Sequence, residues 1–156
     1  MSTRRAKDPG LFSDPARAGV YRIPEQADTP GATRGRGPLA VWRVDLRDVQ
    51  EKGQLLAAIA QALHFPDWFG DNWDALKDCL TDLTWQKASG YVIILEGCSA
   101  FARAAPADFE TALEVFRLLV DDWRESHVPF WVLVGGLAVG EFELPDLPRA
   151  VSPGPR

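Results

Sequence analysis

Tyr91-Val92-Ile93-Ile94-Leu95 is an uninterrupted run of apolar residues near the middle of the chain. Aromatic and β-branched residues favour strands, and a strand without polar alternation is typical of one that is buried on both faces. Strands of this kind occur mainly in the parallel sheets of α/β proteins. The run therefore predicts the centre of an α/β domain.

Helix and strand patterns alternate on either side of this run. Before it, residues 39–44 have the composition of a strand, and amphipathic helical patterns follow at about 55–63 and 72–83. After it, a long helical pattern covers 106–123, and residues 130–134 supply another strand. The order β, α, α, β, α, β predicts a single layer of about three parallel strands with right-handed crossovers and helices packed over it.

Proline and glycine divide the chain into three regions. The prolines and glycines of residues 1–38 predict an irregular basic arm. Within it, we expect residues 20–23 to be extended and to dock on the α/β domain. Residues 39–140 form the predicted α/β domain, and residues 141–156 form a proline-rich tail without regular structure. The first 37 residues hold seven basic and four acidic side chains, whereas the rest of the chain holds 10 basic and 18 acidic ones.

The acidic body disfavours direct nucleic acid binding by the core, because phosphates are bound by lysine and arginine. It favours a basic protein as the partner, with solubility as the alternative explanation of the charge. No apolar run is long enough to span a membrane, and the charged N-terminal residues are not followed by the apolar stretch of a signal peptide. We therefore expect a cytoplasmic protein without membrane contact. Cys79 and Cys98 form no CxxC pair, and we expect buried thiols.

Five aspartates follow a helical spacing in the middle of the chain. Asp67, Asp71, Asp74, Asp78 and Asp82 are separated by four, three, four and four residues, so those within a helix share one face. Aspartate has low helix propensity, and solubility alone would favour glutamate with lysine. The other side of the same segment is apolar and turns the aspartates outward. The pattern predicts an acidic helix, from Asp71 to Asp82, that is offered to a basic partner.

The start of this helix carries further signals. Asn72 is a predicted N-cap, and the position of Asp74 in the first turn suits the positive end of the helix dipole. Trp68 and Phe69 precede Gly70, whose backbone freedom permits a sharp turn into the helix. Aromatic side chains beside charged groups are typical of binding hot spots, with core packing as the alternative for either ring.

Residues Trp68 to Thr81 read aromatic-aromatic-Gly-acidic-Asn-x-Asp-Ala-Leu-x-Asp-Cys-Leu-Thr. This segment resembles the barstar family, intracellular protein inhibitors of secreted bacterial ribonucleases. Shorter matches at 95–96, 115–117 and 132–134 extend the resemblance to about residues 40–135. The resemblance implies a barstar-like fold and an inhibitor of immunity or antitoxin type, which needs no cofactor, no metal and no catalytic residues.

The resemblance also implies a set of partner-binding residues. In that family the helix and the loop before it block the nuclease active site, and Asp78 matches the carboxylate that takes the place of the substrate phosphate. Asp74 matches a second contacting aspartate. Such mimicry uses charge-assisted bonds from carboxylate to guanidinium. The remaining positions of the predicted binding site are Trp68, Phe69, Gly70, Asn72, Lys77 and Thr81.

Two departures from the family leave the partner open. Lys77 stands at the position of a tryptophan, and Leu118 replaces an acidic contact. The alternative is therefore a barstar-fold binding or regulatory module for another basic protein, without nuclease inhibition. An enzyme is a third interpretation, with Asp74 and Asp78 as a carboxylate pair and His64 as a base. We expect no enzyme, because no HExxH motif, phosphate loop, or Ser-His or Cys-His arrangement accompanies these residues.

Overall fold

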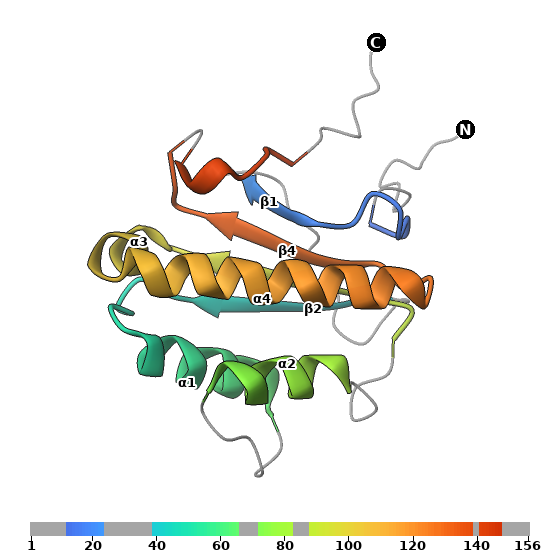
Figure 1. Cartoon of the computed structure of the whole chain (residues 1–156), viewed down its shortest axis with the longest axis horizontal. Coiled ribbons are helices and arrows are strands. Elements are labelled where there is room, and N and C mark those ends of the chain that lie inside the picture. The colour runs from blue at the N-terminus through green and yellow to red at the C-terminus, as the bar shows by residue number, and fades with distance from the viewer. Residues whose placement is uncertain (1–11, 24–38, 66–71, 83–87, 139–140, 148–156) are drawn as a thin grey trace.

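The computed structural model of the chain describes residues 12–23, 39–65, 72–82, 88–138 and 141–147 (Figure 1). Within these residues the elements follow one another in an alternating order that agrees with the α/β pattern of the sequence. They are β1 (Val20–Ile23), β2 (Leu39–Asp45), α1 (Lys52–Leu63), α2 (Trp73–Thr81), β3 (Gly90–Glu96), α3 (Ser99–Ala104), α4 (Pro106–Glu125), β4 (Phe130–Gly135) and the 3-10 helix η2 (Glu141–Glu143).

The strands form one parallel sheet in the order β1-β4-β3-β2. The predicted α/β architecture is confirmed, and β2, β3 and β4 are the three predicted strands. The prediction of about three strands is one too low, because Val20–Ile23 pairs with β4 as a fourth strand, with Val20 opposite Val132. Four residues between Gly19 and Pro24 are too few for their pattern to reveal a place in a sheet.

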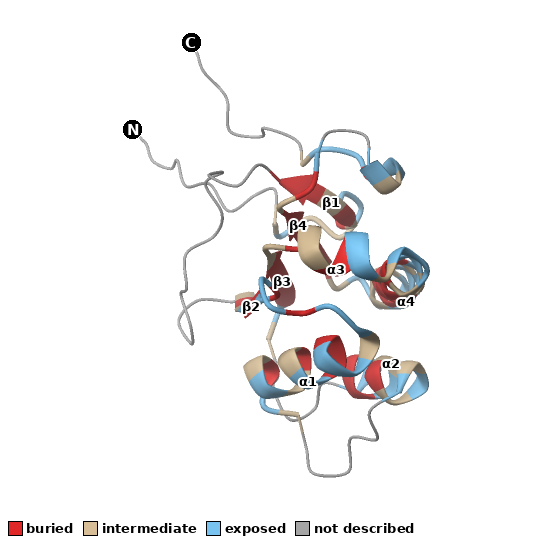
Figure 2. Cartoon of the chain, turned by 90° about the vertical axis from the view of Figure 1, so that its left-hand side faces the viewer, coloured by how far each residue is buried: buried red, intermediate tan, exposed pale blue. Residues whose placement is uncertain are grey.

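α3 and α4 lie on one side of the sheet, and α1 and α2 lie next to its β2 edge (Figure 2). α4 contacts β4 and β1, and α1 contacts β2 at the opposite edge. The path from β2 to β3 to β4 steps in the same direction across the sheet each time. Right-handed crossovers between such strands place their connecting helices on the same face. This arrangement brings α2 and α4 side by side on the surface of the molecule.

The core is centred on β3 and β4. Both strands are buried along their length, except for the last residue of β3, as the apolar run predicts. On the helix side, Trp123 of α4 packs against Tyr91 and Phe130, with ring centroids 5.4 and 6.4 Å apart. On the other side, the rings of Phe12 and Trp131 meet edge to face at 4.8 Å. These contacts explain why the strands lack polar alternation.

The segment after β4 covers part of the outer edge of β1. The backbone N–H of Arg22 donates to the Pro145 carbonyl at 2.7 Å, and the Leu147 N–H donates to the Arg22 carbonyl at 3.0 Å. The buried guanidinium of Arg22 donates to the Asp146 carboxylate at 2.7 Å and to the Leu137 carbonyl at 3.1 Å. The prolines predict a tail without regular structure, but the structure has η2 and this strand-like contact there.

Both cysteines are buried as free thiols, as the sequence predicts. Cys79 lies in α2, and Cys98 directly precedes α3, where its thiol donates to the Leu95 carbonyl at 3.6 Å. In the described part of the chain, none of the helices is long and apolar enough to cross a membrane.

Candidate protein-binding face

α2 is a short helix with a well-defined start and a sharp division between its two sides. The Asn72 side chain accepts a hydrogen bond from the Ala75 N–H at 2.7 Å, which confirms the predicted N-cap. Leu76, Cys79 and Leu80 are fully buried and hold the helix against the rest of the molecule. Burial of this stripe fixes the opposite side of α2 toward solvent.

The exposed side of α2 is acidic. Asp74, Asp78 and the C-cap residue Asp82 are exposed and stand four residues apart, and Thr81 is exposed beside them. Asp74 and Asp78 have no ion-pair partner among the described residues. The structure therefore places these predicted site residues on one solvent-facing side. The other predicted residues, Trp68, Phe69 and Gly70, lie outside the described residues, as do Asp67 and Asp71.

Lys77 does not present an isolated positive charge on this surface. Its ammonium group lies 3.4 Å from the carboxylate of Asp122 on α4, and both side chains are partly exposed. The pair joins two helices whose residues are 45 positions apart in the sequence. The charge of Lys77 is thus compensated within its own chain.

α4 also holds the end of α2 in place. The indole N–H of Trp123 donates to the Leu80 carbonyl at 2.9 Å. That carbonyl belongs to the last turn of α2, where backbone oxygens lack partners within the helix. The Asp82 N–H donates to the Asp78 carbonyl at 3.0 Å and closes the same turn. The side chains on the exposed side of α2 therefore project from a helix that is fixed at both ends.

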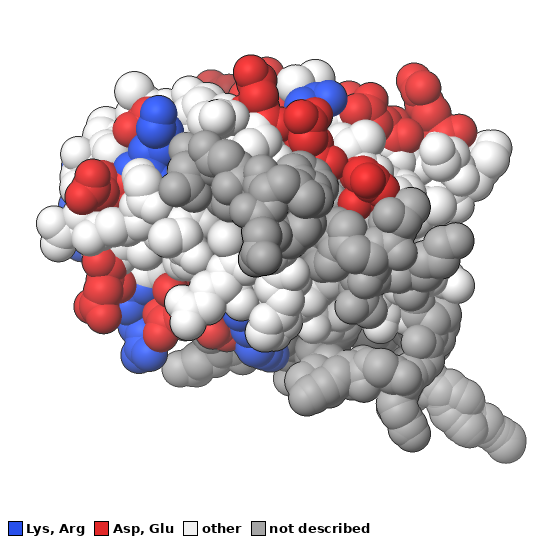
Figure 3. Space-filling model, turned by 90° about the horizontal axis from the view of Figure 1, so that it is seen from below, with Lys and Arg blue, Asp and Glu red and all other residues white. Residues whose placement is uncertain are grey.

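The charges of α4 extend the acidic surface. α4 contains six acidic residues and two arginines. Arg117 lies 3.3 Å from Glu114 and Arg124 lies 2.6 Å from Asp121, so both arginines have carboxylate partners on their own helix. Figure 3 shows acidic side chains along its upper edge, on the side where α4 lies. We call the following exposed carboxylates the acidic face: Asp74, Asp78, Asp82 and Asp122.

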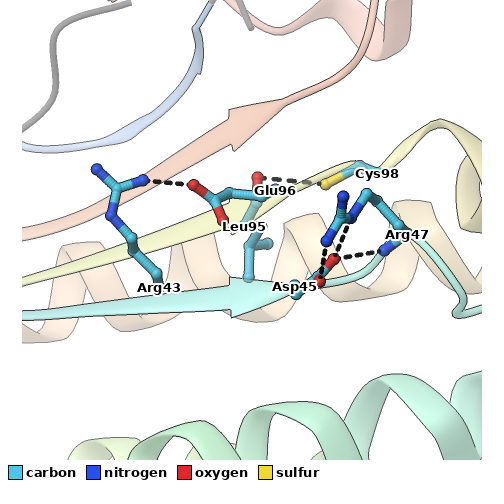
Figure 4. Close-up of polar contacts among 6 residues, drawn as sticks. All are labelled: Arg43, Asp45, Arg47, Leu95, Glu96 and Cys98. Carbon is cyan, nitrogen blue, oxygen red and sulfur yellow. Dashed lines mark hydrogen bonds and ion pairs between the residues drawn. The ribbon is translucent and has the colours of Figure 1, made fainter. Parts of the chain in front are cut away.

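A second group of charges lies where β2 and β3 end, and its members are paired with one another (Figure 4). Arg43 contacts the Glu96 carboxylate on the neighbouring strand. The Arg47 guanidinium binds both oxygens of Asp45, at 3.0 and 2.7 Å. The side-chain and backbone N–H groups of Arg47 hold the pKa of Asp45 at about 2, below its ordinary value. These carboxylates already have cationic partners.

The geometry gives little support to the interpretation as an enzyme. His64 is an exposed residue in the left-handed conformation, with φ 57°, and caps the end of α1. An open hollow of about 400 Å³ is lined by residues of β1, by Arg117 and by the tail rather than by Asp74 or Asp78. Burial raises the pKa of the Cys79 thiol, and the carboxylates of Asp78 and Asp82 raise it further. This thiol is therefore a packing group rather than a nucleophile.

Two residues that shape the acidic face are missing from the predicted site. Asp122 neutralises Lys77, and Trp123 binds the Leu80 carbonyl. In the sequence, Trp123 is recognised only as the last apolar residue in the helical pattern of residues 106–123. Its indole N–H is the signal that could have been used, because a tryptophan N–H usually finds a hydrogen-bond acceptor when it is buried. The identity of that acceptor depends on the packing of α4 against α2.

The fold and this face define an α/β protein with one parallel sheet and an acidic pair of surface helices. The chain belongs to the barstar (barnase inhibitor) family, whose model matches residues 39–135. The match begins with the first residue of β2 and ends with the last residue of β4. It therefore includes α2 and α4, whereas β1 and η2 lie outside it. Members of this family are inhibitors rather than enzymes.

Comparison with other proteins adds information on the fold alone. No curated protein matches the sequence. Among solved structures, the chain is similar to one in the "Structure of Drosophila ORC bound to DNA", with a TM-score of 0.53 and 12% sequence identity. The similarity covers 85% of this chain and 36% of that chain. At this level of identity, it indicates a shared arrangement of strands and helices.

Proposed function

We propose that the protein inhibits a basic microbial ribonuclease by laying its acidic face over the nuclease active site. The observation that carries this proposal is the position of Asp78. Its carboxylate is exposed on α2, has no ion-pair partner among the described residues, and belongs to a domain that matches the barstar (barnase inhibitor) family. A carboxylate in this position is available to a cationic partner.

The proposed mechanism is mimicry of the substrate phosphate. A ribonuclease holds the phosphate of RNA with cationic side chains, and a carboxylate can accept the same hydrogen bonds. Such bonds strengthen when the interface excludes water, because the effective dielectric constant falls. Asp74, one turn before Asp78, supplies a second acidic contact on the same side. The proposed binding site further includes Trp68, Phe69, Gly70, Asn72, Lys77 and Thr81.

An inhibitor of this type protects the cell that makes the nuclease. We therefore propose a role as an immunity protein or antitoxin in the cytoplasm. The two buried free thiols suit a reducing compartment, where disulfides are rare. The net charge of −5 for the whole chain is consistent with attraction to a basic partner.

A second candidate function is a barstar-fold module that binds another basic protein and does not inhibit a nuclease. The observation that favours it is the chemistry of the seam between α2 and α4. Lys77 and Asp122 form a compensated pair there, and Leu118 is 49% exposed. Lys77 and Leu118 are two positions at which the sequence departs from the barstar family. Both lie beside the acidic face, so they alter the surface that a nuclease bound by this family would contact.

The test is a pull-down from the secreted proteins of the producing cell, analysed by mass spectrometry. The wild-type protein and the Asp78→Ala variant serve as parallel baits, because Asp78 is exposed and we expect its truncation to leave the fold intact. We expect the wild-type bait alone to recover a small basic ribonuclease and to suppress its cleavage of RNA at near one-to-one stoichiometry. Recovery of a basic protein without nuclease activity would favour the second candidate, and recovery of neither would contradict both.

A further inference from the structure

Leu118 is an unusual residue on this surface. Among the described residues it is the one large apolar side chain that is exposed, with 49% of its surface accessible. It lies on α4, four residues before Asp122, and therefore one helical turn away on the same side of the helix. Asp122 reaches across to Lys77 of α2. Leu118 thus stands next to the seam where the two helices meet.

The direction of the helices places Leu118 beside the start of α2. Lys77 contacts Asp122, and the Leu80 carbonyl, three residues later in α2, contacts Trp123. Contacts in the same order indicate that α2 and α4 run in the same direction, as Figure 1 shows. One turn before Lys77 on α2 is Asp74. Leu118, one turn before Asp122, consequently lies on the stretch of α4 that runs alongside Asp74.

The charges around Leu118 differ from those on α2. Its three acidic neighbours on α4 all have cationic partners within the chain. The pairs are Glu114 with Arg117, Asp121 with Arg124, and Asp122 with Lys77. By contrast, Asp74 and Asp78 have no ion-pair partner among the described residues. The surface therefore divides into unpaired carboxylates on α2 and a neutralised apolar zone around Leu118 on α4.

We propose that Leu118 is a specificity-determining contact, which meets an apolar or aromatic side chain of the basic partner. This inference rests on the proposed function. A cation directly opposite Leu118 would lose hydration against an apolar side chain whose carboxylate neighbours on α4 are already paired, which costs free energy. An apolar side chain in the same place gains by leaving water. The partner that fits this surface is a basic protein whose cationic site has an apolar residue at its margin.

The experiment compares Leu118→Ala, Leu118→Glu and Asp78→Ala for affinity toward a panel of purified basic guanyl-type bacterial ribonucleases. We expect Leu118→Ala to weaken binding about tenfold, because half of this side chain is still exposed before binding. The loss should be the same at about 0.05 M and 0.5 M salt, since apolar contacts are not screened. Leu118→Glu should bind more weakly than Leu118→Ala, because its new carboxylate is desolvated without a cation.

Thermal unfolding of the same variants is the control for folding, and an exposed leucine should tolerate both changes. Affinity that is unchanged in Leu118→Ala, or tighter in Leu118→Glu, would overturn the inference, since the latter would show that a cation faces this position. If Asp78→Ala loses affinity while the Leu118 variants do not, the proposed function stands and this inference fails. If wild-type protein binds none of the ribonucleases, the proposed function fails and this inference fails with it.

Discussion

Two charged regions of the molecule use carboxylates in opposite ways. At the ends of β2 and β3, Asp45 and Glu96 each face an arginine of the same chain (Figure 4). On α2, Asp74 and Asp78 are exposed and have no such partner among the described residues. A paired surface carboxylate can stabilise the fold slightly, whereas an unpaired one on a helix of like charges contributes repulsion. This difference is the basis of the proposal that the acids of α2 contact another molecule.

The largest expected effect comes from Asp78→Ala. Truncation of one member of a buried interfacial charge pair costs about 2 to 5 kcal/mol of binding, a range informed in part by complexes of the barstar family itself. Folding stability should be unchanged or slightly higher, because aspartate is a poor helix former and has like-charged neighbours here. Calorimetry with the recovered ribonuclease and thermal unfolding measure the two quantities.

The matched control for this variant is Asp45→Ala, which removes the same charge from the paired region. It should leave the affinity for the ribonuclease nearly unchanged. Equal losses of affinity in both variants would mean that net charge, rather than the position of Asp78, drives binding. Unfolding of Asp78→Ala at a clearly lower temperature would mean that the acidic face is structural.

A substitution on the buried side of α2 should lower folding stability, in contrast to Asp78→Ala, which should lower affinity. Leu80 is fully buried, so Leu80→Ala should lower the free energy of unfolding by about 2 to 5 kcal/mol, through lost burial and the cavity that remains. Leu118→Ala removes the same atoms from an exposed position and should have a small effect. Urea denaturation of both variants tests this difference. A similar cost for the two leucines would contradict the orientation of the helices.

Association with the ribonuclease should slow as salt rises. Between about 0.05 and 0.5 M the Debye length falls from roughly 14 Å to 4 Å, so steering by exposed charges is lost. Stopped-flow measurements should show the association rate constant falling by about tenfold or more in wild-type protein. The dependence should be weaker in Asp78→Asn and unchanged in Asp45→Asn. A rate constant that does not respond to salt would exclude the acidic face from steering.

The sequence predicts the architecture well where a pattern extends over many residues. The apolar run of β3 and the spacing of α4 are long enough to identify a buried strand and an amphipathic helix, and both are confirmed. β1 has four residues, and its place beside β4 depends on a pairing more than 100 residues away. Local pattern holds no information about such a pairing.

For the candidate site, the sequence identifies the outward side of α2 but not the residues of α4 that contact this helix. The spacing of Asp74 and Asp78 and the apolar stripe of α2 together fix which side faces solvent, and the structure agrees. The Lys77–Asp122 pair requires knowledge of how α2 packs on α4. The contribution of Trp68 and Phe69 lies outside the described residues and stays a prediction.

The smallest expected effect concerns pH and the paired region. The hydrogen bonds from Arg47 lower the pKa of Asp45 to about 2, from an ordinary value near 3.8. Since the pKa is lower in the folded state than in the unfolded state, the pair stabilises the fold above about pH 4, and this contribution is lost as pH falls from 4 to 2. Asp45→Asn should therefore be slightly less stable than wild type at pH 6. The effect is small, because both side chains of the pair are more than half exposed.

Urea denaturation of wild type, Asp45→Asn and Glu110→Gln between pH 6 and pH 2.5 measures this contribution. The difference between wild type and Asp45→Asn should shrink as pH falls, because wild-type Asp45 then loses its charge in the folded state as well. Glu110 is exposed and has no ion pair among the described residues, so Glu110→Gln should follow the wild-type curve. If the difference in unfolding free energy between wild type and Asp45→Asn persists at pH 2.5, it does not arise from the charge of the Asp45 carboxylate. Indistinguishable curves at every pH would show that the pair with Arg47 does not stabilise the fold, and the contrast with the unpaired aspartates of α2 would then rest on geometry alone.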